Sequence, residues 1–293
     1  MNLSSLKKNN SFDKLTKALD SLGSGGNNKG SDDRFWVPEV DKAGNGYAVI
    51  RFLDTPQVDG DDGMPWVQMF NHGFQGPGGW FIENCLTSVN QKCPVCEHNT
   101  SLWNSGIESN KDIVRKQKRK LNYIANVLVL KDPAKPSNEG KVFLFKFGKK
   151  IFDKIKEKIE PQFEDEKAIN PFNFWQGANF KLKIRNVEGY RNYDKSEFDT
   201  PGALFDGDDD DIEKVWKASY SLKGFLNPAD FKSYDELKAK LDRVLGVGGV
   251  KPRTKSVEDA GDIEEDIPFS TSSNSSSSDD DDTLSYFNKL ASD

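Results

Sequence analysis

Cysteine and histidine are scarce in this sequence, which limits the chemistry that the chain can perform. Its 293 residues include three cysteines and two histidines. An odd number of cysteines leaves at least one thiol outside any disulfide. We therefore expect no disulfide framework, and metal binding is the better interpretation of the cysteines.

Long apolar runs are absent as well. No stretch of about 18 apolar residues occurs, so no membrane-spanning helix is expected, and the mean hydropathy is −0.71 with 30% charged residues. The first 22 residues contain neither an uninterrupted apolar segment nor a small-residue cleavage site, so we expect no export. A cytoplasmic location follows, in which thiols stay reduced.

Negative charge is abundant, but it is concentrated at one end. The net charge is −6, and residues 258–293 contain eleven acidic residues and one basic residue, Lys289, which gives −10. Residues 1–257 therefore carry +4. This asymmetry is typical of a basic binding body with an acidic tail.

Composition divides the chain into three parts. Residues 1–22 form a short amphipathic, lysine-rich arm, and a linker rich in glycine, serine and asparagine follows it. The core is expected over 23–250. Residues 251–293 are acidic and serine-rich and are predicted to be disordered. The apolar end of this tail, TLSYFNKL, suggests a motif that folds on a partner, although a purely solubilising tail is the alternative.

The core is predicted to be mainly β with some α. Short apolar runs separated by glycine, proline, asparagine and aspartate predict strands in YAVIRFL, YIANVLVL, KVFLFKF and NFKLKI. Helices are predicted over 149–159 and over 233–245, the second opened by a capping box of Ser233 and Glu236. Several strands and few helices favour a small barrel with insertions.

A candidate zinc site has the pattern H-x12-C-x7-C-P-V-C. It consists of His72, Cys85, Cys93 and Cys96, which supply the four nitrogen and sulfur ligands that zinc prefers. With all four positions filled, the zinc is structural, and its region extends over about 65–125. His98 is an alternative fourth ligand. Buried cysteines that bind no metal are the alternative interpretation of the whole pattern. A zinc-dependent hydrolase is disfavoured, because no coordination position stays open.

A basic and aromatic surface accompanies this site. The segment KDIVRKQKRKLNY is predicted to track phosphates through its positive residues, although it can also be an ordinary solvated face. Tyr190 and Tyr193 flank Arg191 in an expected polar loop, where exposed rings suit base stacking. Phe143, Phe145 and Phe147 share one face of a predicted strand and are expected in the core more than at a platform.

These features together resemble a family, the single-stranded DNA-binding, helix-destabilising proteins (gene 32 type) of T-even-like tailed bacteriophages. The resemblance covers nearly the whole chain and rests on AGNGYAVIRFL, NHG with CPVC, ANVLVLKDP, NEGKVF, FGKKIFDKI, WQGANFKLK and NYDKSEF, in that order. The sequence departs from the family pattern in KRKLN, where Leu121 and Asn122 replace hydroxyl residues, and at Ile124, which replaces tryptophan.

The resemblance implies a fold and a division of labour. It implies an OB-fold barrel core with a zinc subdomain, an N-terminal arm for cooperative self-association, and a C-terminal tail for other replication proteins. It assigns one structural Zn²⁺ to His72, Cys85, Cys93 and Cys96. The DNA-contacting set, from the resemblance and the residue patterns together, is Trp103, Arg115, Lys116, Lys118, Arg119, Lys120, Tyr123, Phe145, Lys146, Tyr190, Arg191 and Tyr193.

The expected function is sequence-independent, cooperative coating and protection of single-stranded DNA in phage replication, recombination and repair, without catalysis, in the host cytoplasm. Besides DNA and further copies of itself, the implied partners are a polymerase, a helicase loader, a recombinase and a recombination mediator, bound through the tail. A zinc-containing transcription or protein-interaction adaptor is the alternative. It would bind duplex DNA sequence-specifically or bind no DNA.

Overall fold

The computed structural model describes residues 32–60, 62–163 and 165–247. The chain divides into two compact units, Met1–Phe35 and Trp36–Asp293, and the structure discussed below belongs to the second. The predicted arm (1–22) and tail (251–293) lie outside the described residues.

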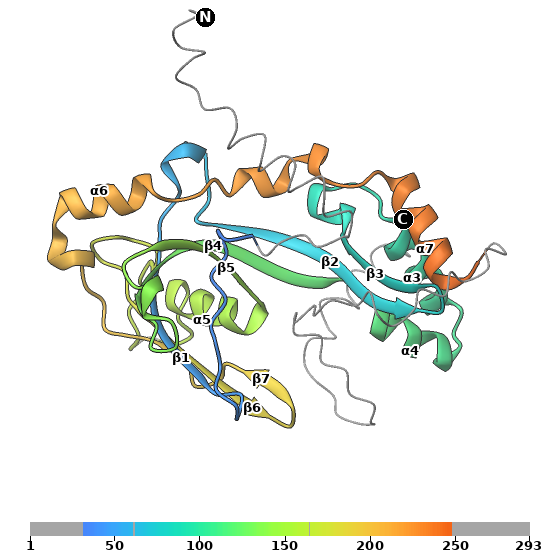
Figure 1. The fold of residues 1–293 in the computed structure, drawn as a ribbon, viewed down its shortest axis with the longest axis horizontal. Coiled ribbons are helices and arrows are strands. Elements are labelled where there is room, and N and C mark those ends of the chain that lie inside the picture. Colours follow the sequence, from blue (N-terminus) through green and yellow to red (C-terminus); the bar gives the residue numbers. More distant parts are fainter. Residues whose placement is uncertain (1–31, 61, 164, 248–293) are drawn as a thin grey trace, which may run out of the picture. The chain divides into compact units, whose positions relative to one another are not determined.

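An antiparallel sheet of eight strands forms the centre of the second unit (Figure 1). Its main path runs β3-β2-β4-β1-β6-β7, with β5 paired to β4 and β8 paired to β6. The strands are β1 Gly46–Phe52, β2 Trp66–Gly76, β3 Gly79–Asn84, β4 Lys120–Lys131, β5 Val142–Phe147, β6 Phe180–Val187, β7 Tyr190–Asn192 and β8 Glu197–Phe198.

Helices cover this sheet and connect its strands. The α-helices are α3 Pro94–Asn104, α4 Glu108–Gln117, α5 Lys149–Ile159, α6 Asp209–Lys217 and α7 Tyr234–Leu245. Short 3-10 turns are η1 Gln57–Asp59, η2 Leu86–Val89, η3 Pro136–Asn138, η4 Leu204–Gly207, η5 Lys223–Leu226 and η6 Pro228–Asp230. No helix in the described ranges combines the length and the apolar character that crossing a membrane requires.

Strand β4 joins the two halves of the sheet. Its first residues pair with β2 (Trp66 with Ala125) and its last residues pair with β1 (Phe52 with Val127), while β5 lies along its other edge. One hydrophobic cluster gathers where β1, β4, β5 and β6 meet helix α5. A second cluster lies at the β2–β3 end and contains the three cysteines.

The predicted mainly-β character with some helix is confirmed, as are the four predicted strands and the two predicted helices. The capping box of α7 is present, with both hydrogen bonds between Ser233 and Glu236. Helices α3, α4 and α6 were not predicted. The starts of α3 and α4 have no capping side chain, whereas α6 is capped by Asp208 within a run of aspartates that was not interpreted as a helix start. The β2–β3 hairpin was missed because glycine and polar residues interrupt its apolar alternation.

The segment expected to be a polar loop around Tyr190 is instead a β-hairpin. Val187 pairs with Tyr190 across a two-residue turn of Glu188 and Gly189, whose φ angles are 55° and 86°. Positive φ at both central residues is the geometry of the tight turn that matches strand twist. In the sequence, the signal for this turn was limited to the glycine at its second position, Gly189.

Candidate metal centre and nucleic-acid interface

The four predicted zinc ligands come from three neighbouring elements and meet at one point. His72 lies on β2, Cys85 directly follows β3, and Cys93 and Cys96 begin helix α3. All four are buried, and their ligand atoms lie within 4.8 Å of one another. His98 is not part of this cluster. All three cysteines are described and none forms a disulfide.

Three distances between ligand atoms of this cluster match those of a tetrahedral zinc site. Zinc bonds of about 2.3 Å to sulfur and about 2.1 Å to nitrogen separate two ligand atoms by about 3.6 to 3.8 Å. The Cys85 and Cys96 sulfurs are 3.5 Å apart, and His72 Nε2 lies 3.7 Å from Cys93 Sγ and 3.6 Å from Cys96 Sγ. The cluster can therefore hold one tetrahedrally coordinated ion.

The protons of this cluster are shared among its four members. Hydrogen bonds from Cys85 and Cys96 lower the pKa of Cys93, whereas the hydrogen bonds with Cys85 and Cys93 raise the pKa of Cys96. Burial lowers the pKa of His72, but its hydrogen bonds to Cys85 and Cys93 outweigh burial and raise that pKa to about 9. These protons are shared among closely packed groups, and an ion bound here would displace them, because a metal takes thiolates and a neutral imidazole as ligands.

Hydrogen bonds from neighbouring residues orient the candidate ligands. His72 Nδ1 lies 3.0 Å from the Gln117 carbonyl oxygen and donates to it, so Nε2 is left facing the sulfurs. Asn99 Nδ2 donates to the same carbonyl at 3.2 Å. The Thr87 hydroxyl lies 3.1 Å from Cys85 Sγ. Sequence patterns gave no signal for Gln117, Asn99 or Thr87, because these contacts depend on how α3, α4 and η2 pack.

Helix α7 closes the metal cluster from far along the chain. Leu237, Leu241 and Val244 pack into the same hydrophobic cluster as the cysteines, and α7 lies beside α3 and β3 (Figure 1). Gly78 allows this approach, because a Cβ there would lie 1.9 Å from the Arg243 carbonyl oxygen. Side chains of α7, which lies outside the region of about 65–125 predicted for the zinc subdomain, therefore pack beside the cysteines.

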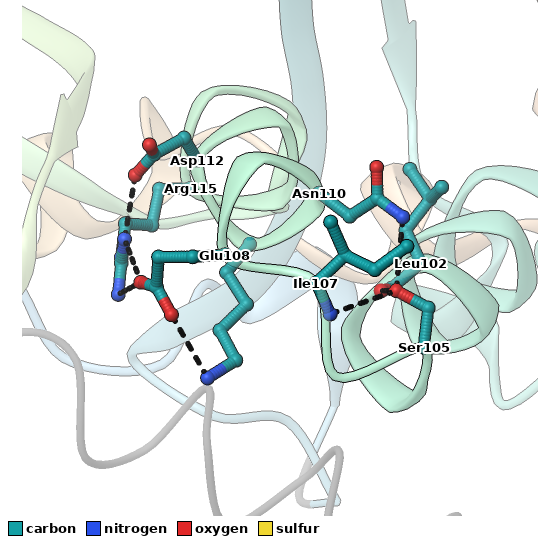
Figure 2. Close-up of polar contacts among 8 residues, drawn as sticks. Leu102, Ser105, Ile107, Glu108, Asn110, Asp112 and Arg115 are labelled. Carbon is teal, nitrogen blue, oxygen red and sulfur yellow. Dashed lines mark hydrogen bonds and ion pairs between the residues drawn. The ribbon is translucent and has the colours of Figure 1, made fainter.

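The predicted phosphate-binding residues follow the metal cluster on α4 and the turn after it. Arg115 and Lys116 occupy the last turn of α4, Lys118 and Arg119 follow the helix, and Lys120 begins β4. Figure 2 shows Asp112 and Glu108 facing Arg115, at 2.6 Å and 3.2 Å. Glu108 and Asp112 therefore already form ion pairs with Arg115, one of the positive residues in the basic segment 111–123.

A polar turn fixes the position of α4. The Ser105 hydroxyl accepts hydrogen bonds from the Ile107 backbone nitrogen at 3.3 Å and from Asn110 Nδ2 at 2.9 Å (Figure 2). The ring of Trp103, near the end of α3, has Lys111 at 5.7 Å and Arg115 at 6.0 Å from its centre. Trp103 and Arg115, both predicted DNA contacts, are thus brought together.

The predicted aromatic contacts differ in exposure. Tyr190 on β7 is 46% exposed, whereas Tyr123 and Phe145 are only 7% and 3% exposed and belong to the cluster around α5. Tyr123 stacks on Phe152 at 3.9 Å between ring centres. Tyr193 is partly buried against the same cluster. Phe145 and Phe147 lie in the core, as the strand alternation predicted.

The positive residues of β6 pair with acidic residues on β8 and on either side of it. Lys181, Lys183 and Arg185 on β6 pair with Asp199, Glu197 and Asp194 at 2.5 to 2.8 Å. Lys146 on β5 is exposed, and Arg191 on β7 follows Tyr190 directly. Acidic neighbours therefore bind positive side chains on β6 and on α4 alike.

Comparison with known proteins identifies the family. Residues 44–245 match the family model described as gp32 DNA binding protein like. The single-stranded DNA-binding protein of Enterobacteria phage T2 is 39% identical over 234 residues, which cover 78% of this chain and 75% of that protein. The single-stranded DNA-binding protein of Enterobacteria phage T4 is 41% identical over 228 residues, which cover 75% and 73%. The chain therefore belongs to the gp32-like DNA-binding protein family.

Proposed function

We propose that this protein coats single-stranded DNA without regard to base sequence, as a non-catalytic component of phage replication, recombination and repair. The observation that carries the proposal is the family membership over residues 44–245, in which the relatives are named as single-stranded DNA-binding proteins. The basic segment after α4 and the exposed Tyr190 supply the two interactions that such binding needs, phosphate contact and base stacking.

Within this function, we assign separate roles to the predicted contacts. Arg115, Lys116, Lys118, Arg119, Lys120, Lys146 and Arg191 bind phosphates, and Trp103, Tyr190 and Tyr193 stack on bases. Tyr123 and Phe145 form the floor beneath this surface, because both are buried in the core and a base reaches at most an edge of either ring. Each stacked base contributes about 1 to 3 kcal/mol.

The metal is proposed to be one structural Zn²⁺ held by His72, Cys85, Cys93 and Cys96. When bound, it joins β2, β3 and α3 and leaves no open coordination position. Metal analysis of protein purified without chelator is expected to give one zinc per chain. Cys96→Ser is expected to lose zinc and to unfold at a lower temperature. A variant as heat-stable as the wild type would contradict a structural metal.

The finer architecture is also a proposal. Strand β4, which has β5 along one edge and both β1 and β2 along the other, is consistent with a sheet that curls into an OB-fold barrel. We further propose that residues 1–22 link neighbouring copies along DNA, that 23–250 form the DNA-binding core, and that 251–293 bind replication proteins in the host cytoplasm. Removing residues 1–22 should weaken coating of long strands far more than binding to a short oligonucleotide.

Single-strand affinity compared with duplex affinity tests the proposed function. A fluorescent oligothymidylate and a mixed-sequence strand are expected to bind alike, with a steep salt dependence, and the matched duplex much more weakly. An adaptor protein would instead prefer one duplex sequence or bind neither form, and that result would overturn the proposal.

A further inference from the structure

Three side chains in sequence, Cys85, Thr87 and Arg119, connect the metal cluster with the basic residues that follow α4. Arg119 donates a hydrogen bond from Nη1 to the Thr87 hydroxyl at 2.6 Å, and the same hydroxyl lies 3.1 Å from Cys85 Sγ. Arg119 also lies over the ring of Phe70, with its guanidinium carbon 4.0 Å from the ring centre. Phe70 packs against the hydrophobic cluster that contains the cysteines.

The direction of these hydrogen bonds follows from the donors available. An arginine can only donate, so the Thr87 oxygen accepts from Arg119. A metal-bound cysteine is a thiolate and can only accept, so the single hydroxyl proton of Thr87 points to Cys85 Sγ. A hydroxyl can serve both neighbours at once only in this arrangement. With a metal ion bound, the Cys85 thiolate would therefore orient Thr87, and Thr87 in turn would orient the guanidinium of Arg119.

The turn η2, which contains Thr87, is attached to β2 by hydrogen bonds. The Cys85 backbone nitrogen donates to the Phe70 carbonyl at 2.8 Å, and the Phe70 nitrogen donates to the Ser88 hydroxyl at 2.8 Å. Thr87 thus occupies a turn, η2, that is fixed to β2 on both sides. A side chain on such a turn can keep Arg119 in one orientation at little entropic cost.

A second connection reaches the same segment from another ligand. His72 Nδ1 donates to the carbonyl of Gln117, the last residue of α4 and two residues before Arg119. Two of the four metal ligands are therefore attached to the stretch 117–119. Loss of the ion would release both attachments, because the thiolate and the imidazole would no longer be held in fixed positions.

We propose that Thr87 is a positioning residue that couples metal binding at Cys85 to phosphate binding by Arg119. This inference rests on the proposed function, in which Arg119 contacts DNA. Thr87 holds the guanidinium over Phe70 in one orientation, and a guanidinium held in a fixed orientation suits the bidentate contact that an arginine makes with a phosphate. By linkage, DNA that binds the positioned Arg119 must also strengthen the hold on the metal.

The chain offers variants that separate this role from a general structural one. Thr87→Val removes the hydroxyl and keeps the shape, and Thr87→Ser restores the hydroxyl. Thr100→Val is the matched control, because the Thr100 hydroxyl also contacts a metal ligand but binds the Cys96 carbonyl oxygen at 2.9 Å instead of a sulfur. Arg119→Ala tests the other end of the connection.

The first measurement is the rate at which a chelator removes zinc, with and without a short oligothymidylate. In the wild type, DNA is expected to slow zinc release about fivefold or more, in keeping with ordinary coupling between two sites. The slowing should disappear in Thr87→Val and in Arg119→Ala, and should persist in Thr87→Ser and Thr100→Val. Slowing that persists in Thr87→Val would overturn the proposal.

The second measurement is DNA affinity as a function of salt in the zinc-loaded proteins. Thr87→Val should lower the salt slope by about one, the same as Arg119→Ala, and the double variant should lose no more than either single one. In cobalt-substituted protein, the sulfur-to-metal absorption band should shift in Thr87→Val and return in Thr87→Ser. Additive losses in the double variant would show that the two residues act independently.

These outcomes are distinct from a failure of the proposed function. If the wild-type protein bound no single-stranded DNA, the proposed function itself would be wrong. If the wild type binds DNA and Thr87→Val retains the wild-type salt slope and zinc release, only the coupling through Thr87 is wrong.

Discussion

Single residues in this protein draw their roles from neighbours that are distant in sequence. His72 and His98 are equally plausible ligands by type, yet only His72 lies among the three sulfurs, because β2 carries it into the buried cluster. Tyr123 and Phe145 are similar cases. The resemblance marks both as DNA contacts, but their strand faces turn toward α5 and leave them 7% and 3% exposed.

Arg51 is a buried charged residue with a large expected effect on stability. It is 1% exposed on β1, and its Nη2 donates to the backbone carbonyls of Asn173 at 2.8 Å and of Gly202 at 2.9 Å. Burial lowers its pKa to about 10. The arginine thus attaches two loop segments to the sheet through hydrogen bonds to their backbone.

Replacing this side chain should destabilise the protein. Arg51→Met fills much of the volume but removes donors from the loop carbonyls, so the free energy of unfolding should fall by about 2 to 4 kcal/mol. Urea denaturation followed by tryptophan fluorescence measures the change. Lys217→Met, at an exposed helical ion pair, is the control and should change stability by less than about 0.5 kcal/mol. Equal effects would show that Arg51 is not a structural anchor.

At the scale of elements, helix α4 combines opposite charges on one surface. Glu108 pairs with both Lys111 and Arg115, and Asp112 pairs with Arg115 (Figure 2). Hydrogen bonds to Lys111 and Arg115 lower the pKa of Glu108, so it stays ionised at neutral pH. A phosphate that binds Arg115 must therefore compete with two carboxylates of the same helix.

Neutralising these acids should strengthen DNA binding. The double variant Glu108→Gln and Asp112→Asn should bind single-stranded DNA several-fold more tightly at low salt, and the gain should shrink as salt screens the charges. Fluorescence anisotropy over a salt series measures it. Asp211→Asn on α6, which pairs with Lys214 at 2.7 Å, is the matched control. No gain over this control would mean that α4 does not face the DNA.

Helix α7 should stabilise both the metal centre, by packing against it, and the folded protein. Leu241 is 1% exposed in the cluster that contains the cysteines, and Leu241→Ala should cost about 2 to 5 kcal/mol and speed zinc release. Lys238→Ala on the same helix, where Lys238 forms an exposed pair with Asp242, should do neither. Chelator-driven zinc release and thermal unfolding measure the two effects. Unchanged zinc release in Leu241→Ala would separate α7 from the metal centre.

How far the sequence predicted these elements depended on local signals. The strands of strong apolar alternation and the capped helix α7 were predicted, because their patterns lie within a few residues of one another. The four-residue metal pattern was predicted from its Cys-x2-Cys spacing and from the scarcity of cysteine and histidine, although it extends over residues 72–96. Helix α4 lacks a capping side chain, and the packing of α7 on the cysteines joins residues about 150 positions apart, so neither had a local signal.

At the scale of the whole molecule, charge is divided between a basic body and an acidic end. Residues 1–257 carry +4 and residues 258–293 carry −10. The second segment lies outside the described residues, so this comparison rests on sequence. Two opposite charges on one chain are held at a high effective concentration, which makes weak, screened attraction between them significant.

We therefore predict that the acidic segment competes with DNA for the basic surface. Deleting residues 258–293 should raise the affinity for single-stranded DNA most at low salt. At high salt, screening already weakens the attraction between the acidic segment and the basic surface, so the deletion has less effect. Changing Asp279, Asp280, Asp281 and Asp282 to asparagine should reproduce much of this gain while sparing partner binding, whereas Phe287→Ala should weaken partner binding and leave DNA affinity unchanged. Anisotropy at several salt concentrations and pull-down of replication proteins measure the two effects. A deletion that alters neither would show that charge division along the chain has no part in binding.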